Sequence, residues 1–467
     1  MASMAIFAGK QRKMLPEDFL KRISHQDYID ATGLTEALGK PSPVSVRINP
    51  YKWAQPVSGY KKVLWEPQGY YLPVKQLFTP DPLFHAGVYY PQEASSMFTG
   101  EVFRQVTAGM KELRVLDLCG APGGKSTHLS ALINDRGFLV ANEVIRSRSA
   151  VLAENITKWG LGNTVVTQND PSAFASLPSF FDVIVADAPC SGEGMFRNPA
   201  AVQEWSPQNA RLCSERQRRI VMEVWPSLKP GGILIYATCT FNPAENEENI
   251  SWFRDSTSSE SVGIDIGGST GIEPVRYAGT EGYGFHPGKV EGDGFFIAVL
   301  RKTKGKSDSH LRIRIFGQKP SSKTSGLAGQ MLTIDSDRLI IAENRVMALA
   351  TDRNIFSYIN DRLTVIKSGT MIGETKNDTF IPAHDLAMSV KQKAGAWPVC
   401  DASYDEAVAF IRLEQFRIEG MPKGRILIRY RGVPLGFVNN LGSRINNGYP
   451  QAWRMRMERQ PDYGEVL

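Results

Sequence analysis

Residues 113–144 read LRVLDLCGAPGGKSTHLSALINDRGFLVANEV, and this stretch decides the fold. A strand-length apolar run is followed by a Gly/Pro turn, a helical pattern and a second apolar run. Three more strand-like runs follow: TVVTQND (164–170), FDVIVADAP (181–189) and GGILIYAT (231–238). Helical patterns separate them at 146–160 and 207–228. Strands that alternate with helices predict an α/β domain with a Rossmann-like parallel sheet covered on both faces.

The chain of 467 residues is long enough for two to four domains. We expect a small N-terminal domain over 1–83, which contains the helical pattern of residues 16–38. The Rossmann-like domain is expected over 84–302, where FFIAVLRK (295–302) adds one more strand. Residues 303–330 are predicted to be a basic linker, since KPSSKTSG has no apolar period. Short strand-like runs beyond it predict a β-rich region over 331–467.

The composition excludes several classes of protein. Hydrophobic residues make up 42% and charged residues 22%, which is typical of a soluble globular chain. Five cysteines without a C-x-x-C pair argue against a secreted disulfide framework and a zinc knuckle, so no metal site is expected. The apolar runs are too short to span a membrane or to form a signal peptide. We therefore expect a cytoplasmic protein without membrane contact, and a monomer by default.

The net charge of +6 is unevenly distributed along the chain. Residues 1–300 carry 28 Lys/Arg against 31 Asp/Glu, a balance of −3, and residues 301–467 carry 26 against 17, a balance of +9. The basic second part favours a polyanion partner. A solvated surface with uneven charge is the alternative.

The Gly-rich turn after the first strand fits three kinds of ligand site to different degrees. Gly124-Lys125-Ser126 is in register with a P-loop, and VIVADAP resembles its magnesium-holding strand, but Cys119 stands where the first glycine is required. A nicotinamide site needs G-x-G-x-x-G, whereas these glycines fall at 120, 123 and 124. S-adenosylmethionine binds to the same fold without a phosphate. It is the third candidate.

An S-adenosylmethionine site needs an acid at the end of the second strand to bind the ribose hydroxyls. Glu143 stands there, about 20 residues after the turn. Asp170, at the end of the third strand, is placed to meet the adenine. Each could instead be a surface acid or a helix N-cap.

Two cysteines stand at the ends of neighbouring predicted strands. Cys190 follows Asp187 after the fourth strand, and Cys239 follows the fifth. Ligands bind outside the carboxyl ends of such strands, so both thiols and Asp187 are expected to face one site. A lone cysteine is usually a small buried hydrophobe, but a pair at matching strand ends is not explained that way.

The segment after Cys239 resembles a helix start. Asn242-Pro243-Ala244-Glu245 predicts an N-cap, a proline at the first helical position and a capping-box glutamate. A helix beginning so close to Cys239 would favour its thiolate form, and Lys125 would add positive charge. We therefore expect Cys239 to be the better nucleophile of the two.

Methylation of a pyrimidine at carbon 5 requires these groups. Carbon 5 becomes nucleophilic only after a thiolate has attacked carbon 6. A cytosine ring also needs a proton or a strong hydrogen bond at N3, which Asp187 could supply. The thiol must finally be expelled, and Cys190 is placed to assist that step.

These motifs resemble the Nol/Nop/Sun family of RNA cytosine-5 methyltransferases. The resemblance covers about residues 84–302 and rests mainly on DLCGAPGGKSTHLSAL, DVIVADAPCSGEGMFRNP and LKPGGILIYATCTFNPAENEENI. It implies Cys239 as nucleophile and Cys190 in product release, with Asp187 and Lys125 beside them. It also implies that S-adenosylmethionine is bound by a set of turn and strand-end residues, namely Cys119, Gly120, Ala121, Pro122, Gly123, Gly124, Lys125, Glu143, Asp170 and Asp187.

The C-terminal stretch extends the resemblance. GRILIRYRGVPLGFVNNLGSRINNGYPQAWRMR is similar to the PUA-like domain of the bacterial RsmF branch, which modifies small-subunit ribosomal RNA, and places such a domain at about 385–467. Residues 417–459 hold nine Lys/Arg and two Glu, interleaved with Tyr430, Phe437, Tyr449 and Trp453. Such a pattern suits phosphate contact and base stacking, although these aromatics, Phe437 above all, could form the core instead.

The predicted function is methylation of cytosine carbon 5 in RNA, with 16S ribosomal RNA as the expected target. Transfer RNA remains an alternative target. A non-catalytic RNA-binding assembly factor on the same scaffold and a P-loop ATPase remain alternative functions. Arg47 and Asn49, in SVRINP of the N-terminal segment, are left without a predicted role.

Overall fold

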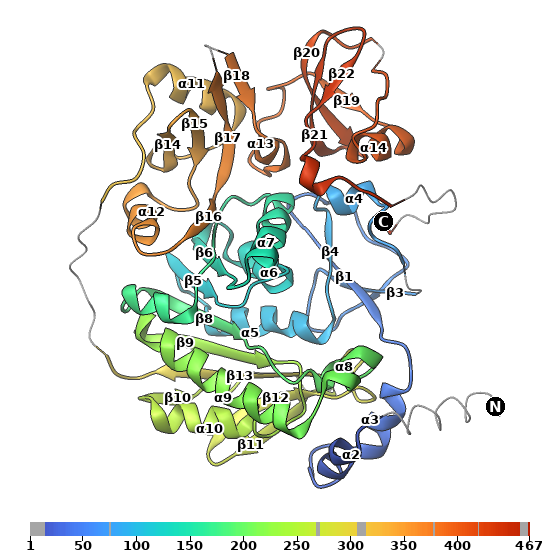
Figure 1. Ribbon diagram of the computed structural model, residues 1–467, viewed down its shortest axis with the longest axis vertical. Helices are drawn as coiled ribbons and strands as arrows, with labels where there is room; N and C mark the ends of the chain where they lie inside the picture. Colours follow the sequence, from blue (N-terminus) through green and yellow to red (C-terminus); the bar gives the residue numbers. More distant parts are fainter. Residues whose placement is uncertain are drawn as a thin grey trace, which may run out of the picture.

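The computed structural model describes residues 15–73, 76–267, 271–305, 314–376, 379–418, 420–457 and 466–467. Within them, the largest sheet has the strand order β11-β12-β13-β9-β8-β5-β6-β7-β16, and β10 pairs with β13 (Figure 1). Its parallel strands are β5 (Leu113–Asp117), β6 (Gly137–Asn142), β7 (Thr164–Thr167), β8 (Phe181–Asp187) and β9 (Leu228–Thr238). This confirms the predicted Rossmann-like α/β core.

Antiparallel strands complete the sheet beside β9. FFIAVLRK forms β13 (Phe295–Lys302), which pairs with β9 as predicted for one further strand. The others on this side are β10 (Ser259–Ser261), β11 (Glu273–Tyr277) and β12 (Thr280–Phe285).

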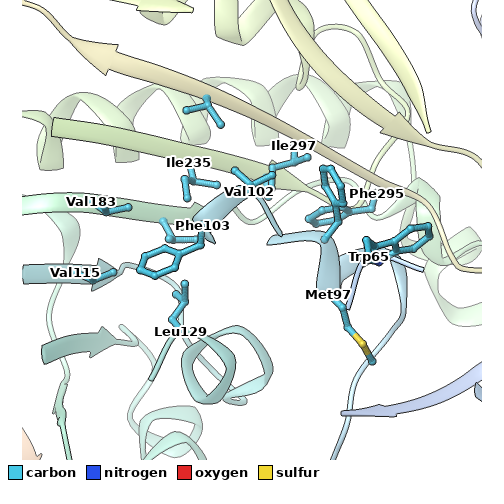
Figure 2. Close-up of a cluster of buried hydrophobic side chains, with 14 of the residues drawn as sticks. Trp65, Met97, Val102, Phe103, Val115, Leu129, Val183, Ile235, Phe295 and Ile297 are labelled. Carbon is cyan, nitrogen blue, oxygen red and sulfur yellow. The ribbon is translucent and has the colours of Figure 1, made fainter. Parts of the chain in front are cut away.

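Helices cover both faces of the central sheet because its strands are apolar on both sides. One face packs against α5 (Phe98–Val106), α6 (Gly124–Ile133) and α7 (Arg146–Trp159). Figure 2 shows Val102 and Phe103 of α5 and Leu129 of α6 beside Val115, Val183 and Ile235 of the strands. The other face packs against α9 (Pro207–Val224) and α10 (Glu247–Ser256). The short α8 (Pro199–Glu204) precedes α9.

The N-terminal part is a small α+β unit attached to this core. The predicted helical pattern over 16–38 forms two helices, α2 (Glu17–Ile23) and α3 (Ala31–Leu38), because the Asp30 side chain caps a second start. A sheet of order β2-β3-β1-β4 follows, with β1 (Val44–Ile48), β2 (Lys61–Lys62), β3 (Gly69–Leu72) and β4 (Tyr89–Pro91). The helix α4 (Pro82–His85) precedes β4.

The second half of the predicted linker over 303–330 contains most of a helix, although KPSSKTSG has no apolar period. Ser321 caps α11 (Ser322–Met331) by accepting a hydrogen bond from the Thr324 backbone N–H. Ala328 and Met331 are buried in the C-terminal part of the molecule. Residues 306–313 lie outside the described residues. The domain boundaries themselves stay predictions.

The region beyond residue 330 forms two small sheets, and one of its strands joins the central sheet. The first sheet holds β14 (Leu339–Ala342), β15 (Arg345–Ala348), β17 (Thr370–Lys376) and β18 (Thr379–Pro382). The strand β16 (Val365–Ser368) pairs instead with β7 of the central sheet. The helices here are α12 (Arg353–Asn360) and α13 (His384–Met388). Phe356 and Ile359 of α12 extend the hydrophobic core under β5 and β6.

The last part of the chain is a sheet of order β19-β20-β21-β22. It contains β19 (Val399–Asp401), β20 (Gly424–Tyr430), β21 (Val433–Asn440) and β22 (Ile445–Asn447), with α14 (Tyr404–Ile411) packed on it. Figure 1 shows both C-terminal sheets at one end of the molecule and α2 and α3 at the other. None of the described helices is both long and apolar enough to cross a membrane.

Most of the C-terminal aromatics that could have stacked on RNA are core residues. Tyr430, Phe437 and Tyr449 are each no more than 5% exposed. The Tyr449 hydroxyl lies 2.9 Å from Nδ1 of His85, in α4 of the N-terminal unit. The stacking interpretation is therefore wrong for these three, and the expectation that Phe437 belongs to the core is confirmed. Trp453 is half-buried.

Candidate active site

Cys190 and Cys239 meet at the carboxyl ends of β8 and β9. These strands are parallel neighbours, with Asp187 opposite Ala237, as predicted from the sequence. The two sulfur atoms are 3.0 Å apart and both thiols are free. The Cys239 backbone N–H also donates to Cys190 Sγ at 3.3 Å. The hydrogen bond to Cys239, and burial after it, hold the pKa of Cys190 well above its usual range, so this thiol stays protonated.

The segment after Cys239 is not the predicted capping box. Asn242 Oδ1 accepts from the Ala244 backbone N–H, and the helix α10 begins only at Glu247. Glu245, which is fully buried, binds Ser191 instead: its carboxylate accepts from the Ser191 backbone N–H at 2.9 Å and from Ser191 Oγ at 2.5 Å. Because Ser191 follows Cys190, Glu245 ties the two cysteine loops together.

The Glu245 carboxyl group has a raised pKa. Gln217 of α9 also donates to it at 3.0 Å, so the hydrogen-bond donors that meet this carboxylate within the described part of the chain are neutral. Burial raises the pKa of Glu245 to about 7, although the hydrogen bonds from Ser191 oppose the shift.

Lys125 and Asp187 form an ion pair beside the cysteines. Lys125 Nζ lies 2.8 Å from Asp187 Oδ2 and 5.2 Å from the centre of the Phe295 ring. Burial lowers the pKa of Lys125, but the charge and hydrogen bond of Asp187 outweigh it and raise that pKa above its usual value. Cys239 lies within electrostatic range of the ammonium group as well. The predicted grouping of Lys125, Asp187 and the two thiols is therefore present.

The Gly-rich turn is held by its carbonyl groups. Oxygens of the turn accept hydrogen bonds from side chains: Ser126 to Gly120 O, Arg148 to Ala121 O, Asn155 to Pro122 O and Arg47 to Gly124 O. Gly123 has φ of 123°, a conformation that favours glycine. These hydrogen bonds fix the turn, which leads directly into the N-terminus of α6, the kind of backbone end that binds polar or anionic groups.

Asp117, the last residue of β5, is a site residue that the sequence reasoning missed. Its Oδ2 accepts from Ser126 Oγ at 2.6 Å, while its buried Oδ1 has no hydrogen-bond partner within the described residues. Burial raises the pKa of Asp117 to about 7. The signal was available, because the aspartate directly precedes the Gly-rich turn.

Glu143 and Asp170 stand at the predicted strand ends with local partners of their own. Glu143 follows β6, is 3% exposed and lies 3.3 Å from Arg148. Asp170 is exposed and accepts from the Ser172 backbone N–H and Oγ, and this hydroxyl lowers its pKa. Asp170 thus has the N-cap geometry that was the alternative reading, which leaves its other carboxylate oxygen for a ligand.

The donor set fits a cationic ligand such as S-adenosylmethionine. Burial raises the pKa of the Cys119 thiol, and the carboxylates of Asp117, Asp187 and Glu143 raise it further because all three lie around it. Asp187 and Glu143 each have a cationic partner, Lys125 and Arg148, whereas Asp117 Oδ1 is a buried acceptor without a hydrogen-bond partner among the described residues, which an ammonium group of the ligand could meet.

Two residues in and just after α2 bind the segment that follows Cys239, and no sequence pattern predicted them. Arg22 donates to the Phe241 carbonyl and forms an ion pair of 2.5 Å with the fully buried Glu193. Gln26 donates to the same carbonyl at 3.0 Å. Glu193 in turn accepts from the Phe241 backbone N–H. The N-terminal unit therefore fixes the segment that follows the second cysteine.

Arg47 and Asn49 have positioning roles. Arg47 is 1% exposed, lies 2.6 Å from Thr127 Oγ1 of α6 and stacks 4.6 Å from the Trp159 ring. Asn49 donates to the Gly87 and Trp159 carbonyls. Both residues attach the N-terminal unit to α6 and α7 rather than face the site.

Comparisons with known proteins identify the family of the chain. Residues 106–301 match the family model of the 16S rRNA methyltransferase RsmB/F, residues 15–94 that of the N-terminal domain of 16S rRNA methyltransferase RsmF, and residues 398–455 that of the methyltransferase RsmF PUA domain. The ribosomal RNA small subunit methyltransferase F of Shigella boydii is 30% identical, over 78% of this chain and 78% of the relative. That of Vibrio atlanticus is 29% identical, over 94% and 97%.

Solved structures agree as well. A methyltransferase homologue from Pyrococcus horikoshii matches with a TM-score of 0.50 and 29% identity, over 62% of this chain and 99% of that one. NSun6 from Pyrococcus horikoshii, solved with SFG, has a TM-score of 0.51 at 20% identity, with the same two shares, and shows the shared fold. The expected family, fold and terminal PUA domain are confirmed, and the chain belongs to the RsmB/F family of 16S rRNA methyltransferases.

Proposed function

We propose that this chain methylates carbon 5 of cytosine in 16S ribosomal RNA, with S-adenosylmethionine as the methyl donor. The observation that carries the proposal is the pair of free thiols, 3.0 Å apart at adjacent strand ends, beside the Lys125–Asp187 ion pair. The names of the relatives support the RNA target.

The first step is attack by Cys239 on carbon 6 of the cytosine ring. The Cys239 sulfur forms the new S–C6 bond, and the negative charge moves through the ring to N3. The thiol proton of Cys239 leaves to solvent as the bond forms, and the Lys125 ammonium group lies within electrostatic range of the sulfur. The Lys125 ammonium group donates a hydrogen bond to Asp187 Oδ2 at 2.8 Å. A proton passed from Lys125 to the Asp187 carboxylate gives that carboxyl group the O–H that donates to N3.

S-adenosylmethionine, when bound, supplies the methyl group that carbon 5 then accepts. Asp117, Glu143 and the Gly-rich turn from Cys119 to Lys125 would hold it, with Asp170 at the adenine. Asp187 would serve both the donor site and the site of the base.

In release, solvent water takes the proton from carbon 5, the C–H electron pair forms the C5–C6 double bond, and the S–C6 electron pair returns to the Cys239 sulfur. Cys190 is the protonated partner in the sulfur pair, since its pKa lies well above the usual range. Its S–H donates to the departing Cys239 sulfur and stabilises the thiolate that forms. Cys190 therefore acts in product release and Cys239 in attack.

The C-terminal region is proposed to hold the RNA. Exposed arginines of the PUA domain, among them Arg431, Arg444 and Arg454, give it positive charge for phosphate contact. We also propose that the protein works as a monomer in the cytoplasm, where its free thiols would remain reduced.

Methylation of total RNA from a strain that lacks this gene tests the proposal. The purified chain should transfer labelled methyl groups to 16S RNA, and bisulfite sequencing should find 5-methylcytosine there. Cys400→Ser, in β19 far from the site, is the matched control for cysteine loss and should retain activity. If only transfer RNA became labelled, transfer RNA would be the substrate instead of 16S RNA. RNA binding without any methyl transfer would favour an assembly factor.

A further inference from the structure

We propose that two asparagine side chains, Asn142 and Asn169, connect the C-terminal region to the Gly-rich turn and position the loop that carries Asp170 for binding of the methyl donor. This inference rests on the proposed function, because it places the donor between that turn and Asp170. We call this chain of contacts the asparagine relay, from Leu118 through Asn142 and Asn169 to Thr364.

The first half of the relay is Asn142, the last residue of β6. Its side chain engages the Asn169 backbone in both directions: Oδ1 accepts from the Asn169 N–H at 3.0 Å, and Nδ2 donates to the Asn169 carbonyl at 2.9 Å. Nδ2 also donates to Leu118 O, and the Asn142 carbonyl accepts from the Gly120 N–H at 2.7 Å. Asn142 is 1% exposed, so it fixes the Gly-rich turn and the end of β7 to each other.

The second half of the relay is Asn169, whose side chain makes the same pair of hydrogen bonds to the next backbone segment. The Asn169 side chain engages the Thr364 backbone: Oδ1 accepts from the Thr364 N–H at 3.0 Å, and Nδ2 donates to the Thr364 carbonyl at 3.2 Å. The Gln168 backbone N–H donates to the same carbonyl at 3.0 Å. Asp170 is the next residue, so this contact sets its position directly.

Thr364 is a rigid anchor because the chain around it belongs to the core. Leu363 is 5% exposed, and Ile359 is fully buried against the central sheet. On the other side, β16 pairs with β7, with Val365 opposite Thr167. These residues lie between the segments matched by the methyltransferase and PUA family models, which end at 301 and resume at 398.

Asparagine suits both positions because its side-chain amide reproduces a peptide group, with one acceptor and donors in fixed geometry. Aspartate has the same shape but cannot donate, and it would place a charge against a carbonyl oxygen. Loss of one such contact shifts the loop away from the arrangement that binds the donor, and the apparent affinity falls with the population that remains competent.

The consequence is that the C-terminal region contributes to donor binding and not only to RNA capture. Asn169 is a positioning residue, because it acts through the Asp170 loop without touching the reacting atoms. Its replacement should therefore raise the dissociation constant and KM for the donor, while kcat at saturating donor and the affinity for RNA stay close to those of the wild type.

Titration calorimetry of full-length protein with S-adenosylmethionine, without RNA, tests the relay through Asn169→Asp. We expect donor binding at least about five-fold weaker, the size of one lost hydrogen bond. Lys391→Ala is the matched control, because Lys391 and Asp135, 2.8 Å apart, also join the C-terminal region to the α/β domain. That pair lies at the amino end of β6, far from Asp170, and its loss should leave donor binding unchanged.

The possible outcomes distinguish failure of the asparagine relay from failure of the proposed function. Donor affinity equal to the wild type in folded Asn169→Asp would overturn the relay. The uncharged Asn169→Ala makes the same test if the aspartate variant does not fold, as judged by its melting curve. Equal loss of donor binding in Lys391→Ala would mean general loosening of the domain contact and would also overturn the relay. If the wild type itself does not bind the donor, the proposed function fails instead.

Discussion

Replacing Glu245 with glutamine should remove a pH-dependent loss of stability from the protein. Glu245 is fully buried, and burial raises its pKa to about 7 from a usual value of 4.5. A carboxyl group with a higher pKa in the folded state stabilises the fold at low pH, and this contribution is lost as the pH rises from about 4.5 through about 7. Between about pH 5.5 and about pH 8, the loss from this one group is about 2 kcal/mol.

Glutamine can occupy the same place without strain. Its Oε1 can accept from the Ser191 N–H and from Gln217, as one oxygen of Glu245 does now. Its Nε2 can donate to Ser191 Oγ, which then turns its proton to Thr240 Oγ1 at 2.9 Å. The variant should therefore keep the tie between the cysteine loops while losing the titration.

Denaturant unfolding at both pH values, followed by tryptophan fluorescence, measures the effect as a difference between variant and wild type. Other titrating groups cancel in that difference, which should change by about 2 kcal/mol in favour of the variant as the pH rises. Glu215→Gln, exposed on α9, is the control and should follow the wild type. Parallel profiles for Glu245→Gln and wild type would refute the assignment of this carboxyl.

Three further results are expected. Lys125→Met should lower kcat for methyl transfer by about 10²-fold or more, because it removes the proton-holding partner of Asp187; near-normal kcat would remove Lys125 from the mechanism. Arg47→Ala should lower the free energy of unfolding by about 3 kcal/mol, measured by denaturation, and a change near zero would contradict its positioning role. Arg444→Glu and Arg454→Glu should each weaken RNA binding in filter assays and reduce its salt dependence, without changing donor affinity; unchanged salt dependence would move the RNA surface elsewhere.

The sequence predicts the core of the site well because its signals are local. Apolar runs alternate with helical patterns, so the parallel order follows, and the two cysteines must then meet at adjacent strand ends. The failed capping-box prediction for Glu245 shows why local sequence patterns are not sufficient. Asn-Pro-Ala-Glu is an ordinary helix start, but a buried serine beside Cys190 offers the glutamate a better partner than its own backbone.

Long-range pairing explains the other differences. The strand β16 pairs with β7, about 200 residues earlier, and no local pattern distinguishes it from its neighbours in the small C-terminal sheet. Arg22 likewise reaches Glu193 across the molecule. The basic residues of the C-terminal region were identified from composition, but most of the aromatics among them are needed for packing.

Truncation of the C-terminal region is a poor test of whether its positive charge binds RNA. A chain cut after Lys302 would lose β16 and the apolar side chains of α12 that complete the central core. Its RNA affinity would report on folding as much as on charge. Single exposed arginines are therefore the appropriate changes.

The central claim is that Cys239 attacks the base and Cys190 releases it. The most direct measurement is a denaturing gel of protein incubated with 16S RNA and methyl donor. Cys190→Ser should give a covalent protein–RNA band, because the S–C6 bond forms but is not broken efficiently. Cys239→Ser and the double variant should give none and transfer no methyl group. Normal turnover by Cys190→Ser without a band, or a band that persists in Cys239→Ser, would contradict the account.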